Sequence, residues 1–167
     1  NGLDYLEYGS RPIENFYESG LLYKYNQFEG SGSEADPYII RTATQLFQVI
    51  ASGGTNRGQK LYYKLGCDID LGGIDWLDTN TIAHASGTYK YYVYKAFTGV
   101  IDGDNHTVSG LYKATSSDGA IALIPELNGG TVKNLNLSDS YVYNSVSGKT
   151  GYLVGNAVDA QIINCST

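Results

Sequence analysis

The chain has 167 residues, enough for one domain with its own hydrophobic core. Only 17% of the residues are charged, whereas glycine (21) and tyrosine (16) are abundant, which favours an extracellular β-rich protein over a cytosolic helical enzyme. The net charge of -6 argues against nucleic acid and against anionic membrane surfaces as partners. No apolar run is long enough to span a bilayer.

Residues 1–30 are rich in tyrosine without a regular period, and we interpret them as an N-terminal arm or linker. Residues 31–167 form the predicted structured module, which begins with a short strand at 36–40. Thr42 and Gln45 have the spacing of a capping box, and Gly53 follows an apolar helical face. The sequence therefore predicts a helix over about 43–52, placed to cover the first coil of a solenoid.

Three later segments share one spaced pattern of aliphatic residues around a bend rich in glycine and asparagine. The first copy, 100–111, aligns onto the second, 124–135, which aligns onto the third, 154–165. The distances between the starts of these copies are typical of solenoid coils, which must stack to bury their apolar sides. The alignment predicts three stacked columns: Val100, Ile124 and Val154; Val108, Val132 and Ile162; Leu111, Leu135 and Cys165.

The same alignment predicts a polar ladder and an open end. Asn134 and Asn164 are equivalent, with Gly110 in the third place, so we expect a short buried amide ladder between coils. The third copy ends at Cys165-Ser166-Thr167 without a capping element, which we interpret as a truncation of the module. Further coils or a protein partner are then expected at the C-terminal end.

Aromatic residues cluster between the helix and the repeats. We predict a ligand-binding platform on this stretch, because exposed rings offer flat faces to sugars and tyrosine hydroxyls add hydrogen bonds. The alternative is that these rings form ordinary cross-strand pairs over the core. The candidate residues are Tyr62, Trp76, Tyr89, Tyr91, Tyr92 and Tyr94.

Two pairs of aspartates offer a weaker candidate for a calcium site. Asp68 and Asp70, and likewise Asp102 and Asp104, stand two positions apart, so each pair lies on one side of a strand. Neither pair has the length or glycine spacing of an EF-hand loop. Residues 102–105 also suit an ordinary turn, and no other cofactor is expected.

Several motifs, taken in their order along the chain, resemble secreted bacterial right-handed β-helix modules that carry GLUG-type repeats. The resemblance covers residues 28–167, and it is carried by residues 35–40, 42–46, 63–71, 97–108 and 151–165. It implies an all-β, right-handed parallel β-helix of few coils behind the short N-terminal helix. It also implies a place in a secreted or cell-surface bacterial protein of the adhesin or polysaccharide-associated kind, and it brings no catalytic residues.

No nucleophile elbow, phosphate loop, dinucleotide fingerprint or zinc spacing is present, so we do not expect an enzyme. The predicted function is non-catalytic recognition of a polysaccharide or cell-surface glycan through the aromatic face. A structural spacer or protein-binding adhesin segment is the first alternative. The second is the N-terminal part of a larger β-helical polysaccharide-degrading enzyme.

Overall fold

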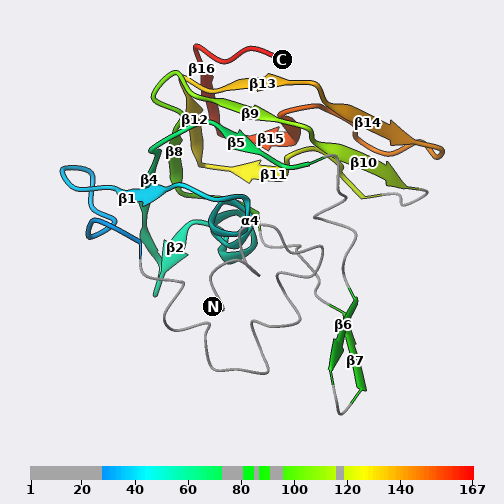
Figure 1. Ribbon diagram of the computed structural model, residues 1–167, viewed down its shortest axis with the longest axis horizontal. Coiled ribbons are helices and arrows are strands. Elements are labelled where there is room, and N and C mark those ends of the chain that lie inside the picture. Colours follow the sequence, from blue (N-terminus) through cyan, green and yellow to red (C-terminus); the bar gives the residue numbers. More distant parts are fainter. Residues whose placement is uncertain (1–27, 73–80, 85–86, 91–95, 116–118) are drawn as a thin grey trace.

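A computed structural model describes residues 28–72, 81–84, 87–90, 96–115 and 119–167. The described part is an all-β structure with one helix, and most of its strands pair in parallel (Figure 1). The main sheet contains β1 (Tyr38–Ile40), β4 (Tyr62–Leu65), β8 (Val100–Asp102), β12 (Thr131–Lys133) and β16 (Gln161–Ile163), in that order.

Three smaller parallel sheets complete the stack. One contains β5 (Ile69–Asp70), β9 (Thr107–Ser109) and β13 (Asn136–Ser138). Another pairs β10 (Tyr112–Thr115) with β14 (Tyr141–Asn144), and the last pairs β11 (Ile124–Asn128) with β15 (Val154–Val158). Two antiparallel pairs stand apart from this pattern: β2 (Thr55–Asn56) with β3 (Gln59–Lys60), and β6 (Thr81–His84) with β7 (Gly87–Lys90).

The helix α4 (Ala43–Ser52) is delimited by local signals. Thr42 is its N-cap and accepts a hydrogen bond from the Gln45 backbone N–H at 3.2 Å. The Gln45 side chain returns to the N–H of Arg41 at 2.7 Å, one position before the N-cap. Gly53 ends the helix with φ 74°, in the left-handed region that glycine adopts without steric cost.

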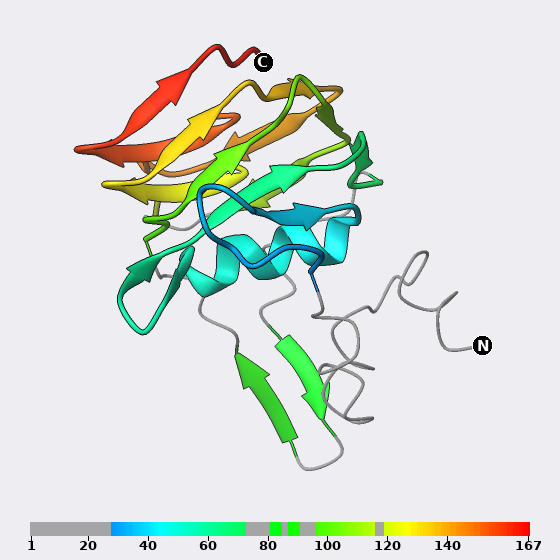
Figure 2. The same ribbon diagram turned by 90° about the vertical axis from the view of Figure 1, so that its left-hand side faces the viewer.

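The helix covers one end of the stack of strands. Leu46, Val49 and Ile50 are buried and belong to the same hydrophobic core as the strands. Figure 2 shows α4 beside the first strands, with successive strands rising from β1 to β16 at the opposite end. One end of the stack is therefore covered by an apolar helical face, whereas β16 is the last strand at the other.

The chain passes through the four parallel sheets repeatedly in the same order. It runs from β8 through β9, β10 and β11 to β12, and then through β13, β14 and β15 to β16. Each return places a strand beside the one from the preceding passage. Inward side chains thereby form columns, such as Tyr63, Ile101, Val132 and Ile162 on the main sheet.

The predicted alignment of the second copy with the third is confirmed. Ile124 of β11 pairs with Val154 of β15, and Val132 of β12 pairs with Ile162 of β16. The predicted equivalence of Asn134 with Asn164 follows the same register.

The predicted alignment of the first copy with the second is wrong. Val100 lies beside Thr131 rather than Ile124, and Val108 pairs with Leu137 rather than Val132. Leu111 also leaves its predicted column with Leu135, because residues 100–111 begin on the main sheet, whereas 124–135 begin one sheet earlier. On every side of a coil, alternate residues of the strand point inward. The spacing of aliphatic residues therefore cannot show whether two strands lie on different sides of one coil or on the same side of two successive coils.

Candidate functional site

The parallel pair β10 and β14 carries a row of exposed tyrosines. Tyr112 is 42% exposed, and Tyr141 and Tyr143 are each 52% exposed. Their side chains share the outward face because alternate residues of a strand point to opposite sides. On the inward face, Lys113 is buried and Val142 packs against the core. We call Tyr112, Tyr141 and Tyr143 the tyrosine face.

The three rings of the tyrosine face are not equivalent. Tyr112 and Tyr141 are directly paired in the register, and their rings stack with centroids 5.3 Å apart and planes at 16°. Tyr143 instead lies opposite Ala114, whose methyl group cannot cover an aromatic ring. The stacked pair therefore presents ring edges and hydroxyl groups. The ring of Tyr143 has only the small Ala114 side chain beside it and is not covered by a second ring.

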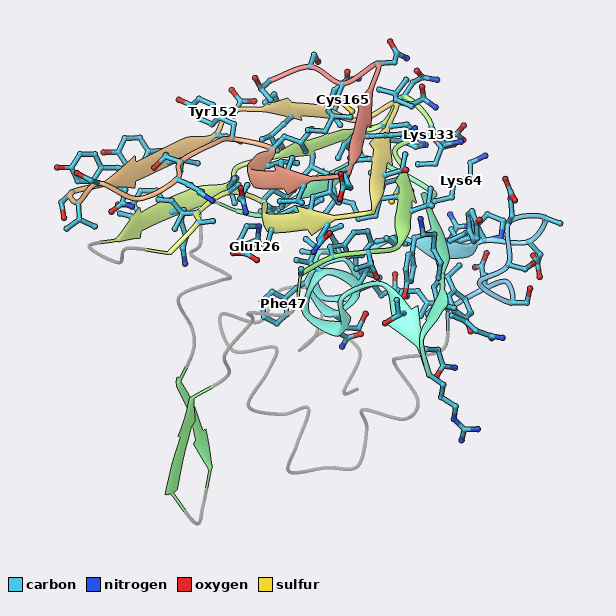
Figure 3. All side chains as sticks on the ribbon, turned by 180° about the vertical axis from the view of Figure 1, so that it is seen from behind. Phe47, Lys64, Glu126, Lys133, Tyr152 and Cys165 are labelled. Atoms are coloured by element: carbon cyan, nitrogen blue, oxygen red, sulfur yellow. The ribbon has the colours of Figure 1, made fainter. Side chains whose placement is uncertain are left out.

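This arrangement suits recognition of a ligand with both apolar and hydroxyl surface. Aromatic rings bury large areas, and the tyrosine hydroxyl retains a polar group at the rim. Tyr152, in the loop after β14, is also exposed, at 48%, but lies outside the tyrosine face. Figure 3 shows it on the side of the molecule where β14 lies.

Most of the platform predicted from the sequence lies outside the described residues. This applies to Trp76, Tyr91, Tyr92 and Tyr94, and the Tyr89 side chain is also outside, although its backbone belongs to β7. Tyr62 faces outward on β4 and is half-buried, whereas its neighbour Tyr63 is buried in the core.

The tyrosine face was missed in the sequence because its signal depends on the correct coil length. Residues 141–143 read Tyr-Val-Tyr, an alternation that indicates one aromatic side. Tyr112 occupies the place of Tyr141 in the preceding coil. The incorrect alignment of the first copy with the second concealed this relationship.

The aspartates of the first predicted pair are engaged with neighbouring donors. Asp68 accepts hydrogen bonds from the Thr107 backbone N–H at 2.9 Å and from His106 Nδ1 at 3.0 Å. These two contacts, the backbone bond first, lower the pKa of Asp68. Asp70 accepts from the Gly72 N–H at 2.7 Å. Asp68 and His106 are far apart along the chain, and the sequence offered no sign of their contact.

The second pair belongs to a charged row on the outward side of the main sheet. Lys64, Asp102 and Lys133 are register neighbours on β4, β8 and β12, and Figure 3 shows both lysines on this side of the molecule. Lys133 Nζ lies 3.1 Å from Asp102 Oδ2, and Lys64 Nζ lies 2.9 Å from Asp104 Oδ2. Among the described residues, no group of three or more His, Cys, Asp or Glu side chains is placed to hold a metal ion. Calcium binding stays a prediction, and an unchanged melting temperature in excess chelator would argue against it.

A ladder of side chains connects successive coils next to this row. It is partly buried at Asn134 and exposed at Asn164, so the prediction that it is buried is wrong. The Asn134 amide donates to Asp102 Oδ1 at 3.0 Å, and the Asn164 amide donates to Asn134 Oδ1 at 3.0 Å. The prediction of Gly110 as the third member is wrong, because Gly110 follows β9 on another sheet. Burial opposes ionisation of Asp102, but the bonds from Asn134 and the Asp104 N–H, together with Lys133, hold its pKa below the ordinary value.

Comparison with known proteins identifies one similar protein but does not assign the chain to a family. No family model matches the chain, so the resemblance to GLUG-repeat modules stays a prediction. The chain is 34% identical over 119 residues to halomucin of Haloquadratum walsbyi. The match covers 69% of this chain but 1% of halomucin, so the chain is similar to a very small part of that protein.

One solved structure is similar at low identity. It is a crystal structure from Bacteroides ovatus named "putative immunoglobulin A1 protease", with 23% identity and a TM-score of 0.49. The match covers 83% of this chain and 39% of that one. At this TM-score the likeness defines neither fold nor activity. Within the part of the chain that the structure describes, no helix has the length and apolar character needed to cross a membrane.

Proposed function

We propose that the chain is a non-catalytic, extracellular recognition module that binds polysaccharide through the tyrosine face. The observation that carries this proposal is the row of three exposed tyrosines on one outward face of β10 and β14. Exposed aromatic rings that gather on one face often mark a surface that contacts a partner. Pyranose rings offer both axial C–H groups for the ring of Tyr143 and hydroxyls for the tyrosine O–H groups.

The fold that we propose as the carrier is a right-handed parallel β-helix of few coils. Its support is the repeated passage through the same parallel sheets, in which Ile101, Val132 and Ile162 recur as register partners at nearly even intervals. A β-helix keeps its outer faces rigid because each strand is hydrogen-bonded to the coil before it. Rigid rings lose little conformational entropy when a ligand binds.

The extracellular location is supported by composition and by the relative. The chain combines few charged residues with many glycines and tyrosines. Its relative is named halomucin, and the aligned segment is 1% of that protein's length. A module inside a long extracellular polypeptide is consistent with both observations.

Binding of the purified chain to a panel of neutral and acidic polysaccharides tests this proposal by depletion of the free protein. We expect saturable binding to at least one polymer, weakened about tenfold or more, ~1.4 kcal/mol, by the double variant Tyr141→Ala and Tyr143→Ala. Tyr152→Ala is the matched control, because this tyrosine is similarly exposed but lies outside the tyrosine face. It should leave the affinity unchanged.

A second double variant, Tyr92→Ala with Tyr94→Ala, tests the platform predicted from the sequence. Loss of binding in this variant alone would move the site to that stretch. A fall in melting temperature without a change in affinity would show that the altered rings only support the structure. Absence of binding to every polymer would contradict polysaccharide recognition.

The second candidate function is a structural spacer within a long surface protein. The specific observation in its favour is the stack itself, in which aromatic, charged and amide rows all run between coils. Such rows stiffen a rod without requiring a ligand.

A further inference from the structure

The two ends of the stack differ in how their strand edges are finished. At the first end, β1 is bridged on its outer side by Glu29 in antiparallel fashion, through the Ile39 N–H to the Glu29 carbonyl at 2.9 Å, and α4 lies nearby. At the other end, β15 and β16 each pair with one strand only among the described residues. An unpaired edge is a template for another strand.

Inward side chains at this second end are exposed although their column partners are buried. Ile162 is 48% exposed, whereas Val132 and Ile101 in the same column are 0% and 1% exposed. Ala157 is likewise exposed beside the buried Leu127 of the preceding coil. Inward-pointing side chains of β15 and β16 that would belong to the core are therefore exposed to solvent.

The amide ladder at this end has a fixed direction. Each later residue donates its side-chain amide to the oxygen of the earlier one, from Asn134 to Asp102 and from Asn164 to Asn134. Asn134 and Asn164 adopt the same left-handed conformation, with φ 52° and 51°. The backbone hydrogen bond next to the ladder runs in the opposite direction, from the earlier coil to the later one. The Asn134 N–H donates to the Ile163 carbonyl of the next coil at 2.9 Å.

The last member of the ladder therefore offers two groups in defined positions. Asn164 is exposed, and among the described residues its Oδ1 and its backbone N–H lack the contacts that Asn134 makes with the following coil. A partner must supply an amide donor and a carbonyl acceptor, both about one strand spacing from Asn164.

We propose that the β15–β16 end binds a further coil of the same type and length, in a register set by Asn164. The coil presents an asparagine in the left-handed conformation, whose side-chain amide donates to Asn164 Oδ1, and an aliphatic residue that covers Ile162. The relative supports this occupant, because the matching segment of halomucin belongs to a far longer polypeptide. This inference does not depend on polysaccharide binding.

A second copy of the chain fits this end less well. Its first end offers α4 and the Glu29 bridge instead of an open edge. Two copies joined by their β16 edges would be related by a twofold axis, and their strands would pair in antiparallel fashion. The evenly spaced parallel register, and with it the amide ladder, would be lost.

The test extends the full chain by one copy of its own residues 138–167, joined directly after Thr167. This copy places the counterparts of Ile162 and Asn164 one coil further along, at the interval that separates Asn134 from Asn164. Hydrogen exchange is then followed at the amides of Ile162 and Asn164. We expect exchange at both to slow about tenfold or more in the extended protein, because a paired strand must open before exchange occurs.

A matched control carries glycine in place of asparagine at the copied Asn164 position. Glycine keeps the left-handed conformation and removes only the side-chain amide. We expect about fivefold less protection in this control, since one hydrogen bond between coils is missing. Equal protection with either residue would overturn the role of the amide in the register.

Two further outcomes would overturn the proposal itself. Unchanged exchange at Ile162 and Asn164, with β9 amides still protected to show that the original coils are folded, would mean that the end does not accept the coil. Concentration-dependent dimerisation of the parent chain, with protection of the same amides in the dimer, would assign the end to a second copy.

Discussion

Asn134 donates its side-chain amide to Asp102 Oδ1 across 3.0 Å, although the two residues belong to successive coils. The same carboxylate accepts the Asp104 N–H at 3.0 Å and faces Lys133. One aspartate therefore closes its own turn and links two coils. Both hydrogen bonds, and the contact with Lys133, favour the ionised form, which makes this point of the fold sensitive to acid.

The first prediction concerns this acid sensitivity. The pKa of Asp102 is lowered in the folded chain, so its ionised form stabilises the fold at pH values above the ordinary carboxyl pKa of about 3.9. That stabilisation is lost as the pH falls through the lowered folded value. We expect Asp102→Asn to be less stable than the parent at pH 7, with the difference shrinking as the pH approaches 2. Urea unfolding across this range measures it.

Asp159→Asn is the control for this series. Asp159 is exposed and has φ 47°, a conformation that asparagine also tolerates. Its stability difference from the parent should be small throughout. A difference for Asp102→Asn that stays constant with pH would contradict the assigned role of the carboxylate.

The second prediction tests the register of the coils through two aliphatic residues. Leu135 is fully buried, whereas Ile163 on the outward side of β16 is 47% exposed. We expect Leu135→Ala to reduce the free energy of unfolding by about 2–5 kcal/mol, because it leaves a cavity. Ile163→Ala should change it by less than about 0.5 kcal/mol. Chemical denaturation gives both values, and similar losses would show that the inward and outward sides are misassigned.

The third prediction concerns a close approach of two coils at Gly103. A Cβ at this position would clash with the Asn134 carbonyl oxygen and would lie 2.6 Å from Leu135 Cα, so backbone atoms would have to move. We expect Gly103→Ala to destabilise the chain by about 3 kcal/mol or more, as overpacking against backbone does. Thermal or urea unfolding measures the loss.

Gly58→Ala is the comparison for that substitution. No atom lies within 4 Å of a Cβ at Gly58, but its φ is +83°. Only backbone strain of about 1–2 kcal/mol should therefore appear. A loss for Gly103→Ala no greater than this would mean that the coils can separate there at little cost.

The fourth prediction concerns alkaline pH and Tyr63. Burial raises the pKa of Tyr63 above its ordinary value, an effect that the nearby Ser52 side chain opposes in part. A raised folded pKa means that the neutral hydroxyl stabilises the fold below pH about 10 and that this contribution is lost as the pH rises through the folded value.

We therefore expect the parent to lose more stability above pH 10 than Tyr63→Phe, which cannot ionise at this position. At pH 7 the stabilities of the two proteins should differ much less than they do above pH 10. Tyr62→Phe, on the outward side of β4, serves as the control. Parallel pH profiles for the parent and Tyr63→Phe would contradict the prediction.

The sequence alone determined the features that depend on neighbours along the chain. Thr42, Gln45 and Gly53 delimit α4 because helix caps act within the first and last turns. The alternation of Tyr62 and Tyr63 placed one ring outside and one inside for the same local reason. The match of the second copy with the third was also readable, because β11 to β12 and β15 to β16 repeat without an insertion.

The tertiary structure decided which strands are neighbours, and with them the candidate site. The inward column of the main sheet follows the chain at uneven intervals, through Tyr38, Tyr63, Ile101, Val132 and Ile162. A period-2 pattern carries no information about the loop lengths behind such intervals, so it could not select Asp102 as the partner of Asn134 or place Tyr112 on Tyr141. These contacts follow from hydrogen bonding between whole coils, because the backbone pairing of each strand fixes which residues of the next coil lie beside it.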